Sequence, residues 1–477
     1  MGCKTNFYAN VSNLHDEVTG SCHYVTVTLP TRDNEKVRFI VDCGLFQEKC
    51  NSHLNDKLPF FPNKLDFILI THTHIDHIGR IPLLYKNRFN KTAYISDIAK
   101  PFMRDALNNT AMIFKQNKTR NNENSAILYD ESHVELTMKN TTSKEYNKSF
   151  YPHENIKVTF FENAHLLGAS TILVEIFYEN EKPINLLFSG DYAAQSNFRD
   201  VPDLPSYVYD LDLTLFTEST YGTTTTNDIE KRFETNILKA IDEGKSIFLP
   251  AFSMQRTQEL LLVLKKMQLA GKIPLSIPIF SDGGLSIGYT QKFLKLSDTF
   301  KPEAQQFLPE NFSYASKNLR NQIINDHNQK IIISSSGMCS YGPAVTYISN
   351  FLSNKNYLIH LNGYSSEGSL ARQLFDAINE DEAIIKIQGV HKIKLCDIDY
   401  SFEFSSHAKK DELITFLNKF NNIKLLMISH GDPEVKDNFA KSCLKKVKAK
   451  DIAIQSSSNV FKIGPYGFIK SYSYKFI

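Results

Sequence analysis

Four side chains that can bind a metal ion fall within one hexapeptide, His72-Thr73-His74-Ile75-Asp76-His77. The hexapeptide follows the apolar run at residues 66–70, which is typical of a buried strand. Alternate residues of an extended segment project to the same side, so His72 and His74 can coordinate one ion. Asp76 and His77, one turn further on, can reach a second ion. A solvated, His-rich loop is the alternative interpretation, but the position directly after a buried strand favours a metal site.

Three further candidate ligands each follow an apolar strand pattern, and they are His165, Asp191 and His430. Gly190 precedes Asp191 and would allow a close backbone approach there. Each of the three residues taken alone is more typical of a capped turn than of a metal ligand. Their occurrence together with the hexapeptide predicts that the ends of several strands meet at one metal site.

The first part of the chain is rich in strand patterns that could position these residues. Strands are expected at residues 22–30, 37–41, 67–70, 157–161, 171–177 and 184–188. Residues 105–150 are rich in Asn, Thr, Lys and Glu, and are expected to form a helix plus a surface excursion.

Helical patterns alternate with short apolar strands after about residue 223, which predicts a parallel sheet. Helices are expected at 228–243, 256–270, 286–297, 343–353 and 367–378, and strands at 247–249, 277–280, 331–334 and 357–361. From about residue 396 the pattern gives a strand, a helix at 408–420, a strand at 423–428 and a helix at 434–447.

The composition limits the classes of partner and the compartment. The chain has 477 residues, with 54 Lys+Arg against 52 Asp+Glu and a net charge of +2. This near balance excludes a globally basic surface, so a polyanion would have to meet a local patch or a metal ion. The 7 cysteines are scattered without a CxxC pair, which favours free thiols in a reducing compartment. Neither a signal peptide nor a long apolar window is evident, so we expect a cytoplasmic protein with no membrane partner.

The ordered series of motifs resembles a known family. His72, His74, Asp76, His77, His165 and Asp191 resemble the HxHxDH…H…D series of the metallo-β-lactamase fold, and Asp42 falls where that fold carries a supporting aspartate. Residues 216–222, 404–407 and 429–431 resemble motifs A, B and C of the β-CASP nucleases, supported by residues 249–259, 335–339 and 363–370. The chain is similar to short, bacterial-type RNA-processing members, related to RNase J and to the endonuclease that cleaves mRNA 3′ ends.

The resemblance implies an α/β fold, an αββα metallo-β-lactamase sandwich with an inserted α/β β-CASP cap domain. The implied division is 1–222 and 404–477 for the sandwich and 223–403 for the cap. One zinc ion would be held by His72, His74 and His165, and a second by Asp76, His77 and His430, with Asp191 bridging both. The nitrogen and oxygen ligands suit zinc, and the carboxylates would also accept manganese.

The resemblance also implies roles in catalysis and in substrate binding. Asp76, His407 and Glu218 would be catalytic, with His407 as the general acid and Glu218 orienting it, and Asp42 would support a ligand. Contacts to substrate are expected from Arg256, Ser335, Ser336, Tyr364 and Arg372, together with Lys409 and Lys410. His430 at motif C favours RNA over DNA as the substrate. The expected partner is single-stranded RNA, and the resemblance allows a homodimer.

We therefore expect a zinc-dependent ribonuclease that acts as an endonuclease, a 5′-exonuclease or both. Three alternatives stay open: a small-molecule hydrolase, an inactive scaffold subunit and a DNA nuclease. Glu218, His407 and the long insertion argue against the first, the complete ligand set against the second, and His430 against the third. One departure from the family pattern follows Cys339, where Ser340-Tyr341-Gly342 replaces the usual Gly-Gly-Arg and puts one substrate or interdomain contact in doubt.

Overall fold

The computed structural model describes residues 7–30, 34–48, 50–120, 127–363, 365–380 and 382–473. These residues form two compact units. The first unit holds the described residues up to Ser196, then Val201–Thr226, and those from Ser406 onward. The second holds Asn197–Asp200 and Asn227–Ser405. The expected domain bounds, 1–222 and 404–477 for the sandwich and 223–403 for the cap, stay a prediction.

Two mixed sheets form the centre of the first unit. The 8-stranded sheet has the order β23-β22-β1-β2-β3-β4-β5-β6. Its strands are β1 (Tyr8–Asn13), β2 (His23–Thr28), β3 (Lys36–Val41), β4 (Phe67–Leu69), β5 (Thr92–Ser96), β6 (Thr141–Lys144), β22 (Asn459–Gly464) and β23 (Gly467–Ser473). The 7-stranded sheet has the order β21-β20-β11-β10-β9-β8-β7. Its strands are β7 (Phe150–His153), β8 (Ile156–Glu162), β9 (Ser170–Ile176), β10 (Ile184–Phe188), β11 (Leu213–Thr217), β20 (Ile423–Ile428) and β21 (Ile452–Ile454).

Alternation along the strands explains why these sheets pack as inner layers. In β3, Phe39 and Val41 join the core between the two sheets, whereas Ile40 joins the core on the opposite face. In β10, Phe188 joins the core between the sheets and Leu187 faces the other way. Because side chains alternate with a period of two, a strand that is apolar throughout must be covered on both faces.

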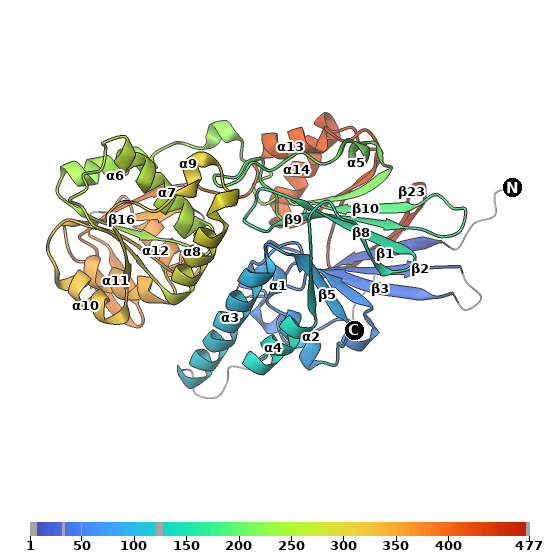
Figure 1. Cartoon of the computed structure of the whole chain (residues 1–477), viewed down its shortest axis with the longest axis horizontal. Helices are drawn as coiled ribbons and strands as arrows, with labels where there is room; N and C mark the ends of the chain where they lie inside the picture. Colours follow the sequence, from blue (N-terminus) through green and yellow to red (C-terminus); the bar gives the residue numbers. More distant parts are fainter. Residues whose placement is uncertain are drawn as a thin grey trace. The chain divides into compact units, whose positions relative to one another are not determined.

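Helices supply the two outer layers, as Figure 1 shows. On the side of the 8-stranded sheet lie α1 (Ile75–Ile78), α2 (Ile81–Lys86), α3 (Lys100–Arg120) and α4 (Glu131–Lys139). On the side of the 7-stranded sheet lie α5 (Ser206–Asp210), α13 (Lys410–Leu417) and α14 (Pro433–Lys446). The first unit is therefore an αββα sandwich, as expected.

The second unit is built on a 6-stranded sheet whose neighbouring strands are all parallel, in the order β14-β13-β15-β12-β16-β19. Its strands are β12 (Ser246–Pro250), β13 (Ile279–Asp282), β14 (Phe312–Ala315), β15 (Ile331–Ser334), β16 (Tyr357–Asn362) and β19 (Asp397–Ser401). Its helices are α6 (Phe233–Asp242), α7 (Arg256–Leu269), α8 (Gly284–Leu296), α9 (Pro302–Gln305), α10 (Lys317–Asn325), α11 (Pro343–Phe351) and α12 (Leu370–Asp376). A hairpin of β17 (Ile384–Ile387) and β18 (Val390–Ile393) completes it. The prediction of a parallel α/β insertion is confirmed.

Residues 105–150 are more regular than their composition predicted. They continue α3, form α4 and contribute the edge strands β6 and β7. The polar composition of this segment hides α4, which is only 9 residues long. The start of α4 is fixed by Asp130, whose side chain accepts hydrogen bonds from the amides of Ser132 and His133. Among the residues that the structure describes, no helix combines the length and the apolar character needed to cross a membrane.

Candidate metal centre

Five strands of the first unit deliver the predicted residues to one edge of the sandwich. His72 and His74 follow β4, His165 follows β8, and Asp191 follows β10. Glu218 follows β11 and His430 follows β20. Strands β10, β11 and β20 are parallel neighbours, so their carboxyl ends fall at the same edge. The topology thus gathers residues that are distant in the sequence.

The first group of candidate ligands contains three imidazoles. His72 Nε2 lies 3.2 Å from His74 Nδ1, which in turn lies 3.1 Å from His165 Nε2. The Oδ2 atom of Asp191 lies 3.5 Å from His72 Nε2 and 3.6 Å from His165 Nε2. The four atoms therefore surround a common point.

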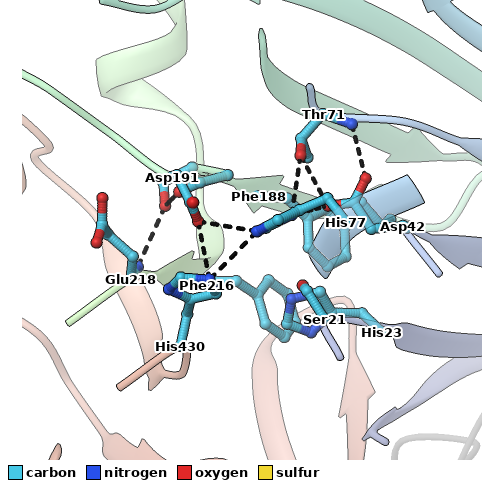
Figure 2. A pocket seen from close by; sticks show the side chains of 13 residues that line it. Ser21, His23, Asp42, Thr71, His77, Phe188, Asp191, Phe216, Glu218 and His430 are labelled. Carbon is cyan, nitrogen blue, oxygen red and sulfur yellow. Dashed lines mark hydrogen bonds and ion pairs between the residues drawn. The ribbon is translucent and has the colours of Figure 1, made fainter. Parts of the chain in front are cut away.

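The second group of candidate ligands lies on the other side of Asp191. His77 Nε2 and His430 Nε2 are 3.2 Å apart, and Oδ1 of Asp191 lies 3.2 Å from the first and 3.3 Å from the second. Asp76 Oδ2 lies 3.9 Å from each of these two nitrogens. Figure 2 shows Asp191 directed at both His77 and His430. Asp191 therefore offers one oxygen to each group.

The second ring nitrogen is anchored in four of these five histidines. Nδ1 of His77 donates to Asp42 Oδ2 at 2.8 Å, and Nδ1 of His165 donates to the carbonyl of Ser406 at 2.8 Å. The two remaining anchors are hydroxyl oxygens, Thr71 Oγ1 for His72 and Thr220 Oγ1 for His430, each at 3.0 Å. A proton placed on Nδ1 leaves the Nε2 lone pair directed at the common point, as metal ligation requires.

Asp42 is not itself a candidate ligand but supports one, and Figure 2 shows it beside His77 and Thr71. Its carboxylate accepts from the backbone amide of Thr71 at 2.8 Å and from the Thr71 hydroxyl at 2.7 Å. Because the Thr71 hydroxyl donates to Asp42, its lone pairs are left for His72. Asp42 and His430 both adopt positive φ values, 63° and 47°, which are uncommon for residues other than glycine.

Burial and the neighbouring charges shift the pKa values of the candidate ligands in different directions. Burial lowers the pKa of His74 to about 4 and that of His72 and His165 well below the ordinary value, so these rings are neutral. Burial opposes ionisation of Asp76, but His430 and His77 outweigh it and lower the pKa of Asp76 to about 2. His77 differs from the other rings, because the Asp191 and Asp42 carboxylates outweigh burial and raise its pKa well above the ordinary value. A metal ion that binds there would displace the proton from His77 Nε2.

The donor set fits divalent metal ions. A tetrahedral ion with Zn–N bonds of 2.0–2.1 Å places its nitrogens about 3.3 Å apart, close to the spacing of the imidazole nitrogens here. Asp191 Oδ1 is buried and has no hydrogen-bond partner among the described residues. A metal ion held by the second group of ligands would provide a partner for that oxygen.

A further pair of side chains lies beside the first group. His407 Nδ1 lies 2.9 Å from Glu218 Oε2, and the ring of His407 lies 4.6 Å from that of His165 between centroids. Glu218 also accepts from the Tyr192 amide at 2.5 Å, which fixes the carboxylate. Burial alone would lower the pKa of His407, but the Glu218 carboxylate raises it above its ordinary value. This pair can hold and deliver a proton next to the candidate metal centre.

The residues expected to contact substrate lie mostly in the second unit. Arg256 is 8% exposed and donates a hydrogen bond to the carbonyl of Asn362. Its Nε atom lies 3.6 Å from Glu259 Oε2. Arg372 is half-buried and pairs with Asp376 at 2.8 Å. Ser335 and Ser336 follow β15 and are half-buried, and Tyr364 lies outside the described residues. Substrate contact by these residues stays a prediction.

The two expected lysines belong to the first unit and have protein partners. Lys409 is buried, donates to the carbonyl of His407 at 2.8 Å and lies over the Tyr221 ring. Lys410 donates to the carbonyl of Thr223 at 3.3 Å. Both lysines therefore help to hold the segment that carries His407.

Sequence reasoning missed several supporting residues. Thr71 directly precedes the hexapeptide and Thr220 lies within motif A, but nothing in their spacing shows which histidine ring each hydroxyl contacts. Asn163 donates to the carbonyls of Ser189 and Asp191, and its side-chain oxygen accepts from the His165 amide. His23 is buried and lines a cavity of about 20 Å³ behind His77 and His430, room for about one water molecule.

Comparison with known families places three matches in order along the chain. Residues 20–238 match the model of the metallo-beta-lactamase superfamily, and residues 257–374 match that of the Beta-Casp domain. Residues 396–454 match the Zn-dependent metallo-hydrolase RNA specificity domain. The chain belongs to the β-CASP family of the metallo-β-lactamase superfamily. Membership confirms the expected fold and the expected enzyme class, a metal-dependent hydrolase of the β-CASP ribonuclease type.

Similar β-CASP relatives cover most of the chain at low identity. An RNase J-like protein of Methanocaldococcus jannaschii is 25% identical, over 90% of this chain and 95% of its own length. A transcription termination factor FttA of Methanosarcina mazei is 25% identical, over 92% of this chain and 70% of its own. An RNase aCSPSF2 of Saccharolobus solfataricus is 25% identical, over 85% and 77% respectively.

Proposed function

We propose that the protein is a zinc-dependent ribonuclease that hydrolyses phosphodiester bonds of single-stranded RNA. The observation that carries the proposal is the Glu218–His407 pair beside two groups of metal ligands that share Asp191. The names of the relatives and the match to an RNA specificity domain support RNA as the substrate. The preponderance of imidazole ligands, without thiolates, supports zinc.

His72, His74 and His165 would hold one ion, and Asp76, His77 and His430 the other, with Asp191 contributing an oxygen to each. When bound, two divalent ions lower the pKa of water toward neutrality and neutralise charge on a phosphate group. Asp76 is the most exposed residue of the second group, with 16% of its side chain accessible, and can orient the attacking water. Asp42, Thr71 and Thr220 keep the ligand rings in place.

His407 would act as the general acid. Its Nδ1 is bound to Glu218, so the proton that it donates leaves from Nε2 toward the departing ribose oxygen. Glu218 stabilises the protonated ring until the phosphorus–oxygen bond breaks. The carboxylate is 1% exposed, so water does not weaken this stabilisation.

Cleavage of labelled RNA tests the proposal. Metal-free protein reconstituted with zinc should cleave 5′-labelled single-stranded RNA, whereas duplex RNA and single-stranded DNA of the same sequence should survive. Asp76→Ala should abolish cleavage, while the matched surface substitution Asp97→Ala should leave it intact. Internal fragments would identify endonuclease activity and mononucleotides exonuclease activity, and 5′-phosphate against 5′-triphosphate substrates would reveal any end preference.

Two outcomes would contradict the proposal. If zinc-loaded protein leaves RNA intact but hydrolyses a small ester or lactam, the protein is a small-molecule hydrolase. If it binds RNA without cleaving any substrate, it is an inactive scaffold.

A further inference from the structure

Motif A of the first unit, residues 216–222, contains Thr220, whose hydroxyl faces a ligand histidine. Thr220 Oγ1 lies 3.0 Å from His430 Nδ1. Two residues earlier, Glu218 holds His407, and the Thr220 amide lies 3.4 Å from Glu218 Oε2. One tripeptide at the end of β11 thus contacts both a candidate metal ligand and the candidate general acid.

The backbone around His430 is held firmly by the same strand end. The amide of Ser219 donates to the His430 carbonyl at 3.0 Å, and the Ser219 hydroxyl donates to the Ser429 carbonyl at 2.9 Å. Gly431 is required because a Cβ atom there would lie 2.4 Å from Ser219 Oγ. These contacts fix the main chain of His430, whereas its buried ring lies against the rings of His77 and His407.

Only one contact restrains the ring of His430 through Nδ1. Among the described residues, Thr220 offers the one oxygen within hydrogen-bond distance of that nitrogen. The other anchored rings have a different kind of partner: a carboxylate oxygen of Asp42 for His77, a backbone carbonyl of Ser406 for His165, and for His72 a Thr71 hydroxyl that is itself bound to Asp42. Within the part of the chain that the structure describes, the hydrogen-bond partner of His430 Nδ1 is therefore a single neutral hydroxyl.

We propose that Thr220 is a positioning residue that fixes the tautomer and orientation of His430, and so controls binding of the second metal ion. The inference rests on the proposed metal centre. Its consequence is that the end of β11 links this ion to the general acid, because Glu218 and Thr220 belong to one tripeptide. Loss of the hydroxyl should weaken the Asp76–His77–His430 group and leave the His72–His74–His165 group intact.

Metal titration tests this inference without relying on activity. Metal-free protein is titrated with Co²⁺, whose absorption reports each site, and with Zn²⁺ against a competing chelator. The wild type should bind two ions, and Thr220→Val should bind one with unchanged affinity and the other about 10- to 100-fold more weakly. Thr220→Ser keeps the hydroxyl and should restore the affinity. Thr141→Val, which removes a buried hydroxyl bound to the Thr137 carbonyl, is the matched control.

Histidine NMR adds a second measurement. With ¹⁵N-labelled imidazoles, the signal of His430 should move away from the Nδ1-protonated tautomer in Thr220→Val and keep its position in Thr220→Ser. If Thr220→Val fails to fold, as judged by the melting temperature of the metal-free protein, Thr220→Ala provides a second deletion of the hydroxyl.

Equal affinity for both ions in Thr220→Val and the wild type would overturn this inference and leave the proposed function standing. Equal losses in Thr220→Ser and Thr220→Val would also overturn it, because the hydroxyl would then not be the cause. A wild type that binds fewer than two ions would overturn the metal centre itself.

Discussion

The two units bury their charged groups in different ways. In the second unit, Asp282 accepts from Arg320 at 2.6 and 3.0 Å and from the Tyr347 hydroxyl at 2.9 Å, so the protein itself satisfies the carboxylate. In the first unit, Asp191 is equally buried, but its carboxylate lies 3.2–3.6 Å from imidazole nitrogens of both candidate ligand groups. A buried carboxylate that pairs with an arginine contributes to the structure, whereas one surrounded by several histidines indicates a metal site.

Substituting Asp191 and Asp282 in turn should give the largest effects and distinguish a carboxylate that binds metal from one that stabilises the fold. Asp191→Ala should lower metal content and RNA cleavage below detection, because both ligand groups lose an oxygen. Asp282→Ala should leave metal content unchanged and lower the free energy of unfolding of the second unit by about 3–5 kcal/mol, since Arg320 loses its partner. Metal analysis and urea denaturation of the metal-free variants measure the two effects. Normal metal content in Asp191→Ala would contradict the account.

Neutralising Glu218 should disable the acid without disturbing the metal ligands. Glu218→Gln should lower the cleavage rate about 100-fold, within the range attributed to general acid catalysis, while metal content stays at the wild-type value. Glu175→Gln is the matched control, because Glu175 is also buried and pairs with Lys157 away from the centre. Single-turnover cleavage with metal analysis provides the measurement, and unchanged rates would rule out the proposed role of Glu218.

Chelation should affect the first unit and spare the second. Metal at 100 times its dissociation constant contributes about 2.7 kcal/mol to the folded state, equivalent to about a 100-fold slowing of amide exchange through unfolding of that unit. A chelator should therefore speed exchange in the segments that follow β4, β8, β10 and β20. Exchange in β12, β13 and β15 should remain unchanged. Equal acceleration in both units would show that the metal does not act locally.

Arg372 should give the smallest effect. Its exposed pair with Asp376 spans one helical turn, so Arg372→Ala should cost no more than about 0.5 kcal/mol of stability. Thermal unfolding measures that cost, and the KM for RNA tests the expected substrate contact. An unchanged KM would remove Arg372 from the binding surface.

The sequence was most informative where ligands are local. The hexapeptide at 72–77 is dense enough to predict a metal site from composition and position alone. His430 is 353 residues from His77, and no local pattern shows that β20 pairs with β11, so its place in the second ligand group came from family resemblance. Parallel strands join distant segments at one edge, and that edge is a property of topology.

Supporting residues could not be predicted for a different reason. Thr71 and Thr220 act through hydroxyls whose partners depend on the rotation of a neighbouring ring. Edge strands such as β6 and β7 were missed because exposed strands carry polar residues and lose the apolar alternation. Substrate contact by Arg256 stays a prediction, and the burial of its side chain beside Glu259 becomes visible only in the folded second unit.

Stepwise zinc titration of the metal-free protein, with cleavage of 5′-labelled single-stranded RNA followed in the same samples, tests the central claim most directly. The account predicts that cleavage appears as the second equivalent of zinc binds, and that His407→Ala binds the same two equivalents while cleaving at least about 100-fold more slowly. Full cleavage by chelator-treated protein, or intact RNA at two bound equivalents, would contradict it.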